Sequence, residues 1–278
     1  MSKHPRFIAI LLALSLSSFF VQADSSQATA KSTLSVKSML NSISVRDEVS
    51  AGYVRSKFRH WIDVDKDSCD TRNEVLISES KEAVKLGSKC TLKSGTWTSK
   101  YDNVQVSNAK DLDVDHMVPL KEAWQSGAFN WNEATRTAFA NDLDFAGSLI
   151  AVTAKSNRSK GDKDPNRWLP TQKSYRCEYI SNWIAVKYRW SLSMDTSEKN
   201  FLVSEVKNCG SKANVAAPKR ATVVISTPTP TPTPDEVNDA RYSSCTAAKA
   251  AGFGPYRKGI DPEYSWYIDR DADGIVCE

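Results

Sequence analysis

The chain has 278 residues and a formal net charge of +4. Residues 1–23 carry +2 and residues 235–278 carry −4, so residues 24–234 carry the remaining +6. This modest basic excess suits a polyanionic partner, but many soluble domains reach it, so charge alone assigns no function. The only long apolar run, at the N-terminus, is short for a bilayer span, which argues against a membrane anchor.

Residues 1–23 have the three parts of a secretory signal peptide. Lys3 and Arg6 supply the positive start, and an apolar stretch follows from Phe7 to Val21. Val21-Gln-Ala23 gives a small-residue cleavage site, and the residue directly after it is not a cysteine that could accept a lipid anchor. We therefore expect a secreted protein with no membrane span after signal cleavage.

Six cysteines follow the signal segment, an even count that suggests disulfide bonds in an exported protein. None of them forms a Cys-x-x-Cys pair of the kind found in zinc ribbons and redox sites. Their grouping along the chain favours three local bonds, each within one structural unit. The predicted pairs are Cys69–Cys90, Cys177–Cys209 and Cys245–Cys277.

Residues 211–240 divide the chain into two domains. The Thr-Pro repeat at 227–234 predicts an extended spacer, because proline lacks the amide proton and fixes φ. Residues 24–210 are long enough to bury a real core. Residues 241–278 are too few to fold readily without a disulfide or a metal ion.

The periodicity of residues 24–210 predicts a mixed α+β domain. A strand over 111–117 precedes helices over 119–126 and 131–141, and an apolar β-branched run predicts a second strand over 148–153. A short helix over 154–161 follows, ended by Gly161. Two packing helices are predicted over 175–190 and 195–208, the second beginning with Asp195 and Glu198 at capping-box spacing.

Two polar motifs overlap the first predicted strand and the short helix after the second strand. The first is Asp111-Leu-Asp-Val-Asp-His-Met-Val-Pro-Leu120, and the second is Ser156-Asn-Arg-Ser-Lys-Gly-Asp-Lys-Asp-Pro165. Only two histidines follow the signal segment, His60 and His116, and we expect His60 to be a packing residue beside Trp61. Neutral imidazole is a suitable general base near neutral pH, which singles out His116.

Both motifs resemble those of the HNH (ββα-metal) endonucleases, in particular a secreted branch of that family, over residues 40–210. The resemblance implies a ββα-metal core that hydrolyses phosphodiester bonds of DNA, or of RNA. It also implies His116 as the general base, with Asp115 and Asn157 as metal ligands. Their oxygen donors favour Mg²⁺ or Mn²⁺. Arg158 and Lys160 are the expected phosphate-binding residues.

Several details of the predicted site are less determined. Asp113 is a candidate carboxylate behind the metal ligands, and Asp162 and Asp164 are further candidate ligands. Adjacent strand residues point to opposite faces, so we expect a bulge or turn to bring Asp115 and His116 together. Many family members place an Asn just before the second strand, where its side chain orients the loop of the base, and this chain has Ser148 at that position. That role falls to Asn141 or to the Ser148 hydroxyl.

The C-terminal residues predict a calcium site. Asp269, Asp271 and Asp273 alternate as in a calcium loop, Gly274 permits the sharp turn, and Ile275 can offer its carbonyl. Glu278, at position ten, takes the place of the usual glutamate at position twelve. With the surrounding cysteines, residues 241–278 resemble the Excalibur extracellular calcium-binding module. A cell-surface ligand is a candidate partner of this module.

A second acidic loop has the same spacing: its carboxylates occupy positions 1, 3, 5 and 12 of the calcium pattern, at Asp63, Asp65, Asp67 and Glu74. Ser68 stands where glycine is usual, so both a calcium loop and an ordinary acidic turn remain open.

The predicted function is therefore an exported, metal-dependent endonuclease. The alternative is a non-enzymatic, calcium-dependent surface or envelope binding protein whose nuclease-like core is inactive. The presence of Asp115, His116 and Asn157 favours the enzyme, whereas Ser148 in place of the family's Asn favours the alternative.

Overall fold

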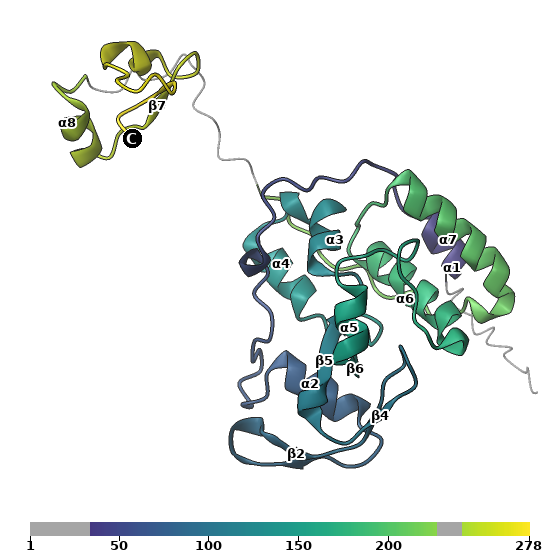
Figure 1. Cartoon of the computed structure of the whole chain (residues 1–278). Helices are drawn as coiled ribbons and strands as arrows, with labels where there is room; N and C mark the ends of the chain where they lie inside the picture. The colour runs from purple at the N-terminus through teal and green to yellow at the C-terminus, as the bar shows by residue number, and fades with distance from the viewer. Residues whose placement is uncertain (1–33, 227–240) are drawn as a thin grey trace, which may run out of the picture. The chain divides into compact units, whose positions relative to one another are not determined.

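A computed structural model describes residues 34–226 and 241–278, which are treated below as separate parts (Figure 1). The predicted signal peptide (1–23) and the Thr-Pro repeat (227–234) lie outside the described residues. Within the described ranges, helices are all too short or too polar to cross a bilayer. All three predicted disulfides are present.

The centre of the larger part is an antiparallel pair of strands followed by a helix (Figure 1). Strand β5 (Leu112–His116) pairs with β6 (Leu149–Thr153), and α5 (Ala154–Lys160) packs against both. In the sequence, the segment between the two strands contains α3 (Leu120–Gln125) and α4 (Glu133–Ala140). The strand–insert–strand–helix order predicted from the sequence is confirmed.

Local sequence sets both ends of α5. The Thr153 hydroxyl accepts a hydrogen bond from the Ser156 amide at 3.3 Å, which satisfies one of the free amides at the helix start. Gly161 has a φ of 59°, a left-handed conformation that favours glycine, and its amide donates to the Asn157 carbonyl. The helix therefore holds Asn157 at a fixed position beside β5.

Three helices form a layer around the main apolar core: α1 (Val36–Ser42), α6 (Arg176–Arg189) and α7 (Thr196–Cys209). The Cys177–Cys209 disulfide joins the start of α6 to the end of α7. Asp195 caps α7 by accepting from the Glu198 amide, as predicted. In a full capping box the Glu198 side chain would also accept from the Asp195 amide. That part of the prediction is wrong, because the Glu198 carboxylate accepts from Trp183 and Lys187 instead.

Helix α2 (Thr71–Glu79) covers the opposite face of the hairpin, where Val75 and Leu76 pack in a second apolar cluster with Val114 and Leu149. Two small two-stranded sheets lie beyond it, held in part by the Cys69–Cys90 disulfide. They consist of β1 (Lys85–Leu86) with β2 (Leu92–Ser94), and β3 (Trp97–Thr98) with β4 (Gln105–Val106). Short 3₁₀ segments occur at Arg55–Lys57, Ser88–Cys90, Ala109–Asp111, Ala128–Asn130, Lys173–Tyr175 and Gly210–Lys212.

The predicted start of the linker at residue 211 is wrong. Apolar side chains between Ala213 and Val223 pack against the main core. The Asn132 amide donates to the Val224 carbonyl, and Ile225 forms a β-bridge with Trp131. Residues 213–226 therefore belong to the larger of the two described regions, because their backbone and side chains contact α4 and the segment before it.

The C-terminal part, residues 241–278, has its own small core around Tyr256, Val276 and Cys277. It contains α8 (Cys245–Ala250), a 3₁₀ segment (Pro262–Trp266) and the antiparallel strands β7 (Tyr256–Arg257) and β8 (Ile275–Val276). The Cys245–Cys277 disulfide joins the helix to the last strand. This covalent link supplements a core that is small for independent folding.

Candidate active site

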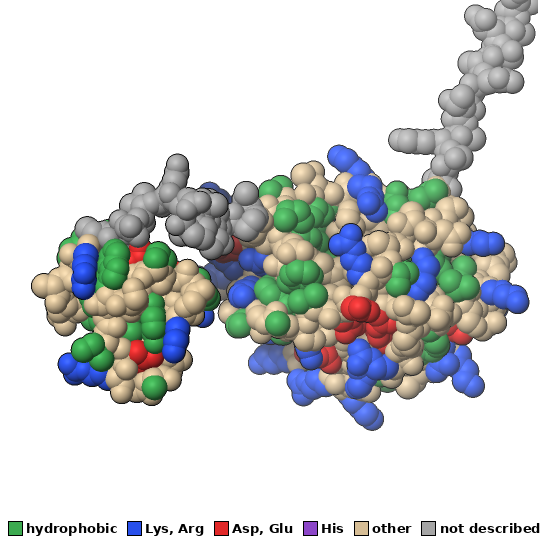
Figure 2. Space-filling view, turned by 90° about the horizontal axis from the view of Figure 1, so that it is seen from above, with side chains coloured by type: hydrophobic (Ala, Val, Ile, Leu, Met, Phe, Trp, Pro, Cys, Tyr) green, Lys and Arg blue, Asp and Glu red, His purple; other side chains and the backbone are tan. Residues whose placement is uncertain are grey.

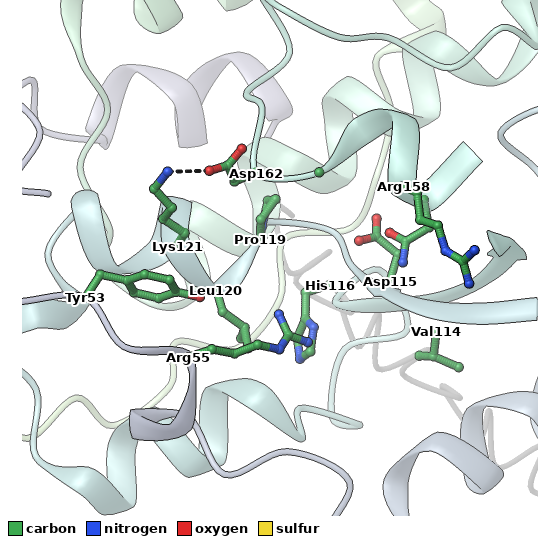
Figure 3. Close-up of a pocket in the computed structure, with 12 residues that line it drawn as sticks. Tyr53, Arg55, Val114, Asp115, His116, Pro119, Leu120, Lys121, Arg158 and Asp162 are labelled. Carbon is green, nitrogen blue, oxygen red and sulfur yellow. Dashed lines mark hydrogen bonds and ion pairs between the residues drawn. The ribbon is translucent and has the colours of Figure 1, made fainter. Parts of the chain in front are cut away.

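A pocket of about 340 Å³ lies at the end of β5, between the start of α3 and the last turn of α5 (Figure 3). Three of the predicted site residues, Asp115, His116 and Asn157, line it together. The other lining residues are Tyr53, Arg55, Val114, Pro119, Leu120, Lys121, Arg158, Gly161 and Asp162. Segments far apart in the sequence therefore meet at the two motifs.

Asp115 and His116 reach this pocket from opposite faces of a regular strand. The five residue pairs of β5 and β6 run in continuous register, including Asp115 with Ile150 and His116 with Leu149. Of the bulge or turn expected here, the bulge is therefore wrong, and the chain instead bends at Met117 and Val118, directly after the strand. Because His116 is the last residue of β5, the pocket extends around the strand end and contacts both side chains.

A backbone carbonyl orients the His116 ring. Its Nε2 lies 2.9 Å from the Ala140 carbonyl oxygen at the end of α4. A carbonyl can only accept, so Nε2 carries the proton and Nδ1 of the neutral ring keeps its lone pair. Trp61 stacks against the same ring with centroids 5.3 Å apart, which fixes the ring plane. The result is an imidazole with a free basic nitrogen.

Burial keeps His116 neutral. The ring is 6% exposed, and the loss of solvation, with smaller contributions from the positive charges of His60, Arg55 and Lys160, lowers its pKa to about 3. The hydrogen bond to Ala140 opposes this shift. The ring is therefore neutral at pH 7 and its Nδ1 can accept a proton, but a base with this pKa is weaker than one that titrates near the working pH.

Neither Asn141 nor Ser148 forms a hydrogen bond with the His116 ring, which is bonded to the Ala140 carbonyl instead. The Ser148 hydroxyl donates to Asp142 at 2.7 Å. The Asn141 side chain donates to the Arg59 and Thr137 carbonyls and accepts from the Ile62 amide. Asn141 therefore anchors the loop that carries His60 and Trp61 to α4, and acts on His116 only through that loop.

Asp115 is buried and receives two hydrogen bonds on one oxygen. Tyr101 donates to Oδ2 at 2.6 Å and Lys160 donates to the same atom at 2.5 Å. Burial raises the pKa of Asp115, and the Lys160 ammonium and the Tyr101 hydroxyl oppose that rise. Both of these bonds leave Oδ1 as the oxygen through which Asp115 can serve as a ligand.

The prediction that Lys160 binds phosphate is wrong. Its side chain is 0% exposed. Its ammonium also donates to the carbonyls of His116 and Met117, at 2.8 and 3.0 Å, so its three protons are engaged. Position 160 ends α5 on the side that faces the strand, and this direction makes Lys160 a buried counter-ion of Asp115.

Asn157 lies on α5 opposite Asp115 and is oriented by Asp113. Its Nδ2 donates to Asp113 Oδ2 at 3.1 Å, so the amide oxygen is directed to another partner. Arg158, the next residue, has a side chain that is 78% exposed and lies 3.9 Å from the same carboxylate. Asp113 thus occupies the supporting position expected from the sequence, and Arg158 extends into solvent at the pocket rim.

Three pocket residues outside the two motifs were missed by the sequence reasoning: Tyr53, Arg55 and Lys121. Lys121 directly follows the first motif, whereas Tyr53 and Arg55 belong to an irregular segment with no motif or periodicity. Only the aromatic ring of Tyr53 and the positive charge of Arg55 could have drawn attention to them. Arg55 is exposed and extends toward His116 in Figure 3. It supplies, with Arg158, the exposed positive charge that Lys160 does not.

The two further candidate ligands have other partners. Asp162 lines the pocket but forms an ion pair with Lys121 at 2.5 Å, drawn as a dashed line in Figure 3. Asp164 is 2% exposed and lies in a separate acidic cluster. The oxygen donors left for a divalent cation at the pocket are therefore those of Asp115 and Asn157. This set of hard oxygen donors fits Mg²⁺ or Mn²⁺.

The surface of the larger part carries many basic side chains. In the view of Figure 2, Lys and Arg side chains follow its edge, with a smaller acidic group among them. This distribution agrees with the excess of +6 over residues 24–234. A basic surface attracts polyanions such as nucleic acids at a distance.

The C-terminal loop gathers three predicted calcium ligands. Oxygens of Asp269, Asp271 and Asp273 lie within 4.8 Å of one another. Gly274 has a φ of 86° and its amide donates to Asp269, which closes the turn. Asp269 Oδ1 is buried and has no hydrogen-bond partner among the described residues, which is expected of a cation ligand. The exposed Glu278 is not part of this cluster, and the role of the Ile275 carbonyl remains a prediction.

The second acidic loop gathers Asp63, Asp65 and Asp67 in the same way, with oxygens within 4.8 Å. All three are exposed. Ser68 has a φ of 78°, so it adopts the conformation that glycine usually supplies at this position. Glu74 lies near enough for the three carboxylates to raise its pKa, after a larger contribution from burial.

Comparison with known proteins gives two family matches. Residues 54–205 match the family described as GmrSD restriction endonucleases, C-terminal domain. Residues 242–278 match the Excalibur calcium-binding domain. A curated relative from Arthroderma benhamiae (strain ATCC MYA-4681 / CBS 112371), described as an uncharacterized secreted protein, is 41% identical over 179 residues. The match covers 64% of this chain and 86% of the relative. No solved structure matches.

Proposed function

Because the chain belongs to the family of GmrSD restriction endonuclease C-terminal domains, we propose that it is a secreted, metal-dependent endonuclease of HNH type. Its reaction is the hydrolysis of phosphodiester bonds in DNA, with His116 as the general base. The signal-like N-terminus, the extracellular type of the C-terminal domain and the secreted relative support export.

The hydrogen bond from His116 Nε2 to the Ala140 carbonyl is the observation that carries this proposal. It leaves Nδ1 unprotonated in a pocket that also presents Asp115 and Asn157. Nδ1 takes a proton from a water molecule as that water attacks the phosphorus, and the bond from phosphorus to the leaving oxygen breaks. The leaving oxygen then takes a proton from solvent. Placement of a base with the correct tautomer is worth about 10²–10⁴-fold in rate.

Asp115 and Asn157 would hold the divalent cation, through Asp115 Oδ1 and the Asn157 amide oxygen. When bound, the cation supplies positive charge for the pentacoordinate transition state and the leaving oxygen. Lys160 and Tyr101 fix the Asp115 carboxylate, and Asp113 fixes the Asn157 amide. The protein therefore holds both ligands in place from behind.

Arg55 and Arg158 bind the phosphates on either side of the scissile bond in this proposal. Both are exposed residues of the pocket lining. Guanidinium groups suit this role because they donate two parallel hydrogen bonds to phosphate oxygens. Contacts to the backbone rather than to bases imply weak sequence preference.

Incubation of the mature protein with plasmid DNA and with RNA, in Mg²⁺, Mn²⁺ or chelator, tests the reaction. We expect cleavage of DNA that depends on the added ion. His116→Ala should lower the rate by about 10²–10⁴-fold with DNA binding unchanged, because only the proton acceptor is lost. Retention of more than half the activity, or a larger loss in His60→Ala, would remove His116 from the base role.

A further inference from the structure

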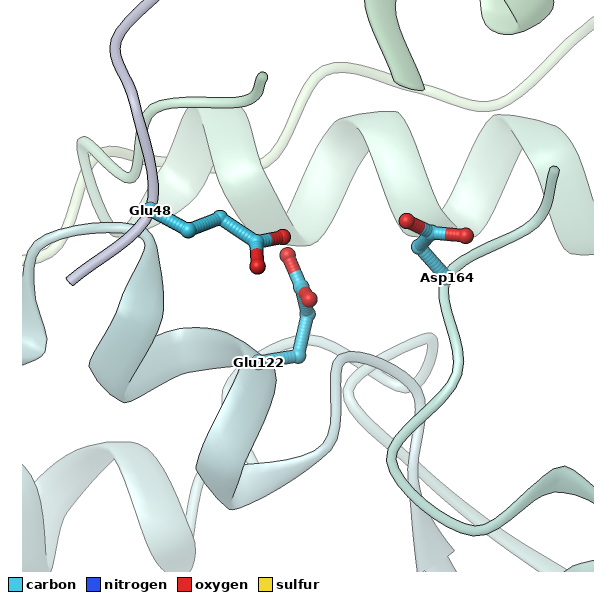
Figure 4. A group of neighbouring side chains, drawn as sticks. All are labelled: Glu48, Glu122 and Asp164. Atoms are coloured by element: carbon cyan, nitrogen blue, oxygen red, sulfur yellow. The ribbon is translucent and has the colours of Figure 1, made fainter. Parts of the chain in front are cut away.

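Three acidic side chains from separate segments converge behind the pocket (Figure 4). Glu48 comes from the segment after α1, Glu122 from α3 and Asp164 from the loop after α5. Each offers one carboxylate oxygen, and these oxygens lie within 4.8 Å of one another. Figure 4 shows the three carboxylates directed toward a common space.

The surrounding cations do not balance these charges. Glu122 is 0% exposed and Asp164 is 2% exposed. Lys187 pairs with Glu122 at 2.8 Å, but it also pairs with the buried Glu198 at 2.6 Å. Arg167 pairs with Asp164 at 3.3 Å, and Glu48 accepts from the neutral Gln125 amide. Four carboxylates thus share two positive charges.

One oxygen in the cluster has no partner at all. Glu122 Oε1 accepts from Lys187 and from the Ser126 hydroxyl. Glu122 Oε2 is buried and has no hydrogen-bond partner among the described residues. Burying a carboxylate oxygen without a partner is unfavourable, so an unpaired oxygen of this kind indicates a missing ligand.

We propose that Glu48, Glu122 and Asp164 bind one calcium ion. The donors are all hard oxygens, which disfavours zinc. Mg²⁺ keeps several waters and is usually bound through one or two carboxylates, whereas Ca²⁺ accepts larger sets of protein oxygens. Three converging carboxylates therefore favour calcium.

The ion would tie together the elements that shape the pocket. Helix α3 supplies Leu120 and Lys121 to the pocket lining, and the loop after α5 supplies Gly161 and Asp162. Glu122 and Asp164 extend from these same two elements to the acidic cluster. This inference does not depend on the proposed nuclease function, because the cluster and its ion lie outside the pocket lining.

Calcium stoichiometry and thermal unfolding of the full mature chain test the site. Glu122→Gln is the informative variant, because the amide oxygen still accepts from Lys187 and Ser126 while the charge is lost. Glu198→Gln is the matched control: it removes a carboxylate equally buried on Lys187 that is not part of the cluster. The other acidic loops are the same in all variants, so their contribution cancels.

We expect Glu122→Gln to bind one calcium ion fewer per chain than the wild type and Glu198→Gln to bind the same number. Saturating calcium should raise the wild-type melting temperature by about 5–10 °C more than that of Glu122→Gln. In chelator the difference in melting temperature between the wild type and Glu122→Gln should become smaller or change sign, because the amide removes an unneutralised charge. Glu48→Gln, at the more exposed corner, should weaken the affinity about tenfold or more.

Equal stoichiometry and an equal calcium response in the wild type and Glu122→Gln would overturn the proposal. That result would mean that protons neutralise the cluster. If Glu122→Gln does not fold, Glu48→Gln decides in its place. An unchanged calcium affinity in Glu48→Gln would then have the same meaning.

Discussion

Lys160 ends α5 with its ammonium between Asp115 and two backbone carbonyls. A buried pair of this kind is strongly destabilised when one partner is removed, because the other charge then stays in the interior alone. Arg158, two residues earlier, is 78% exposed and free to meet a ligand. Of the two cations of this motif, Lys160 is therefore part of the buried structure, and only Arg158 is exposed enough to contact a ligand.

Lys160→Met should lower the free energy of unfolding by about 3–5 kcal/mol and leave the salt dependence of DNA binding unchanged. Arg158→Ala should do the opposite: stability within about 0.5 kcal/mol of the wild type, and a salt slope reduced by about one. Urea unfolding and binding titrations at several salt concentrations measure both. Lys207→Ala, an exposed cation outside the pocket, is the control. A reduced salt slope in a stable Lys160→Met variant would restore Lys160 to the binding surface.

Asp115→Asn and Asn157→Ala should each weaken metal binding, so that part of the lost activity returns at high Mn²⁺. Asp113→Asn should have a smaller effect of the same kind, because Asp113 only orients the Asn157 amide. Activity measured against metal concentration gives the three affinities. Curves for Asp115→Asn and Asn157→Ala that overlay the wild type would contradict the ligand assignment.

For single residues, the sequence predicts which side chains come together at the site, but it predicts much less about the direction of each side chain. Asp115, His116 and Asn157 follow from two motifs whose chemistry depends on residue type and order. The direction of Lys160 does not, because it depends on the packing of α5 against β5. Arg55 lies in a segment without a pattern, so only the folded chain brings it to the pocket.

The free edge of the two-stranded hairpin is covered by α2. The Ala151 amide of β6 donates to Glu79 Oε2 at 3.0 Å, so a carboxylate takes the place that a further strand would fill. Burial raises the pKa of Glu79 to about 7, although the hydrogen bond from Ala151 opposes this. The edge of the hairpin is thus protected by a group that titrates near neutral pH.

Glu79 should make stability depend on pH. Its folded pKa of about 7 exceeds the unfolded value of 4.5, so the folded state binds the proton more tightly. The contribution is complete below pH 4.5 and is lost as the pH rises through 7, by up to about 3 kcal/mol. Urea unfolding between pH 5 and about 8 should show this fall, and Glu79→Gln should flatten it. An identical slope in Glu79→Gln would exclude this group as the cause.

Helices and strands could be predicted where apolar residues recur with a clear helical or strand spacing. The strands at β5 and β6 and the helices α3 to α7 follow from apolar spacing and from end signals such as Thr153 and Gly161. Strands β1 to β4 contain only two or three residues each, too few to show an alternation. Residues 213–226 have no regular period either, and only tertiary partners such as Trp131 hold them on the core.

On the scale of the whole molecule, the C-terminal module should bind calcium by itself. Its core is small, so the Cys245–Cys277 bond and an ion at Asp269, Asp271 and Asp273 should supply much of its stability. Calcium at a hundredfold excess over Kd should stabilise the isolated fragment 235–278 by about 2.7 kcal/mol. Asp269→Asn should erase that gain in thermal unfolding. Absence of a calcium heat in calorimetry would contradict this.

Deletion of residues 235–278 should leave turnover on free plasmid largely intact, since the proposed catalytic residues lie between Arg55 and Arg158. The measurement is initial rates of the full and truncated chains on the same DNA. A truncated chain that folds but does not turn over would show that the module takes part in catalysis.

The carbonyl of Ala140 gives the active site a component that no side-chain substitution can delete. Every amino acid at position 140 would present the same oxygen to His116, provided that the end of α4 keeps its shape. In the proposed mechanism, Ser148 therefore does not by itself indicate loss of activity. Changes that unwind the last turn of α4 should disturb the orientation of His116 more than the lack of an amide at position 148 does.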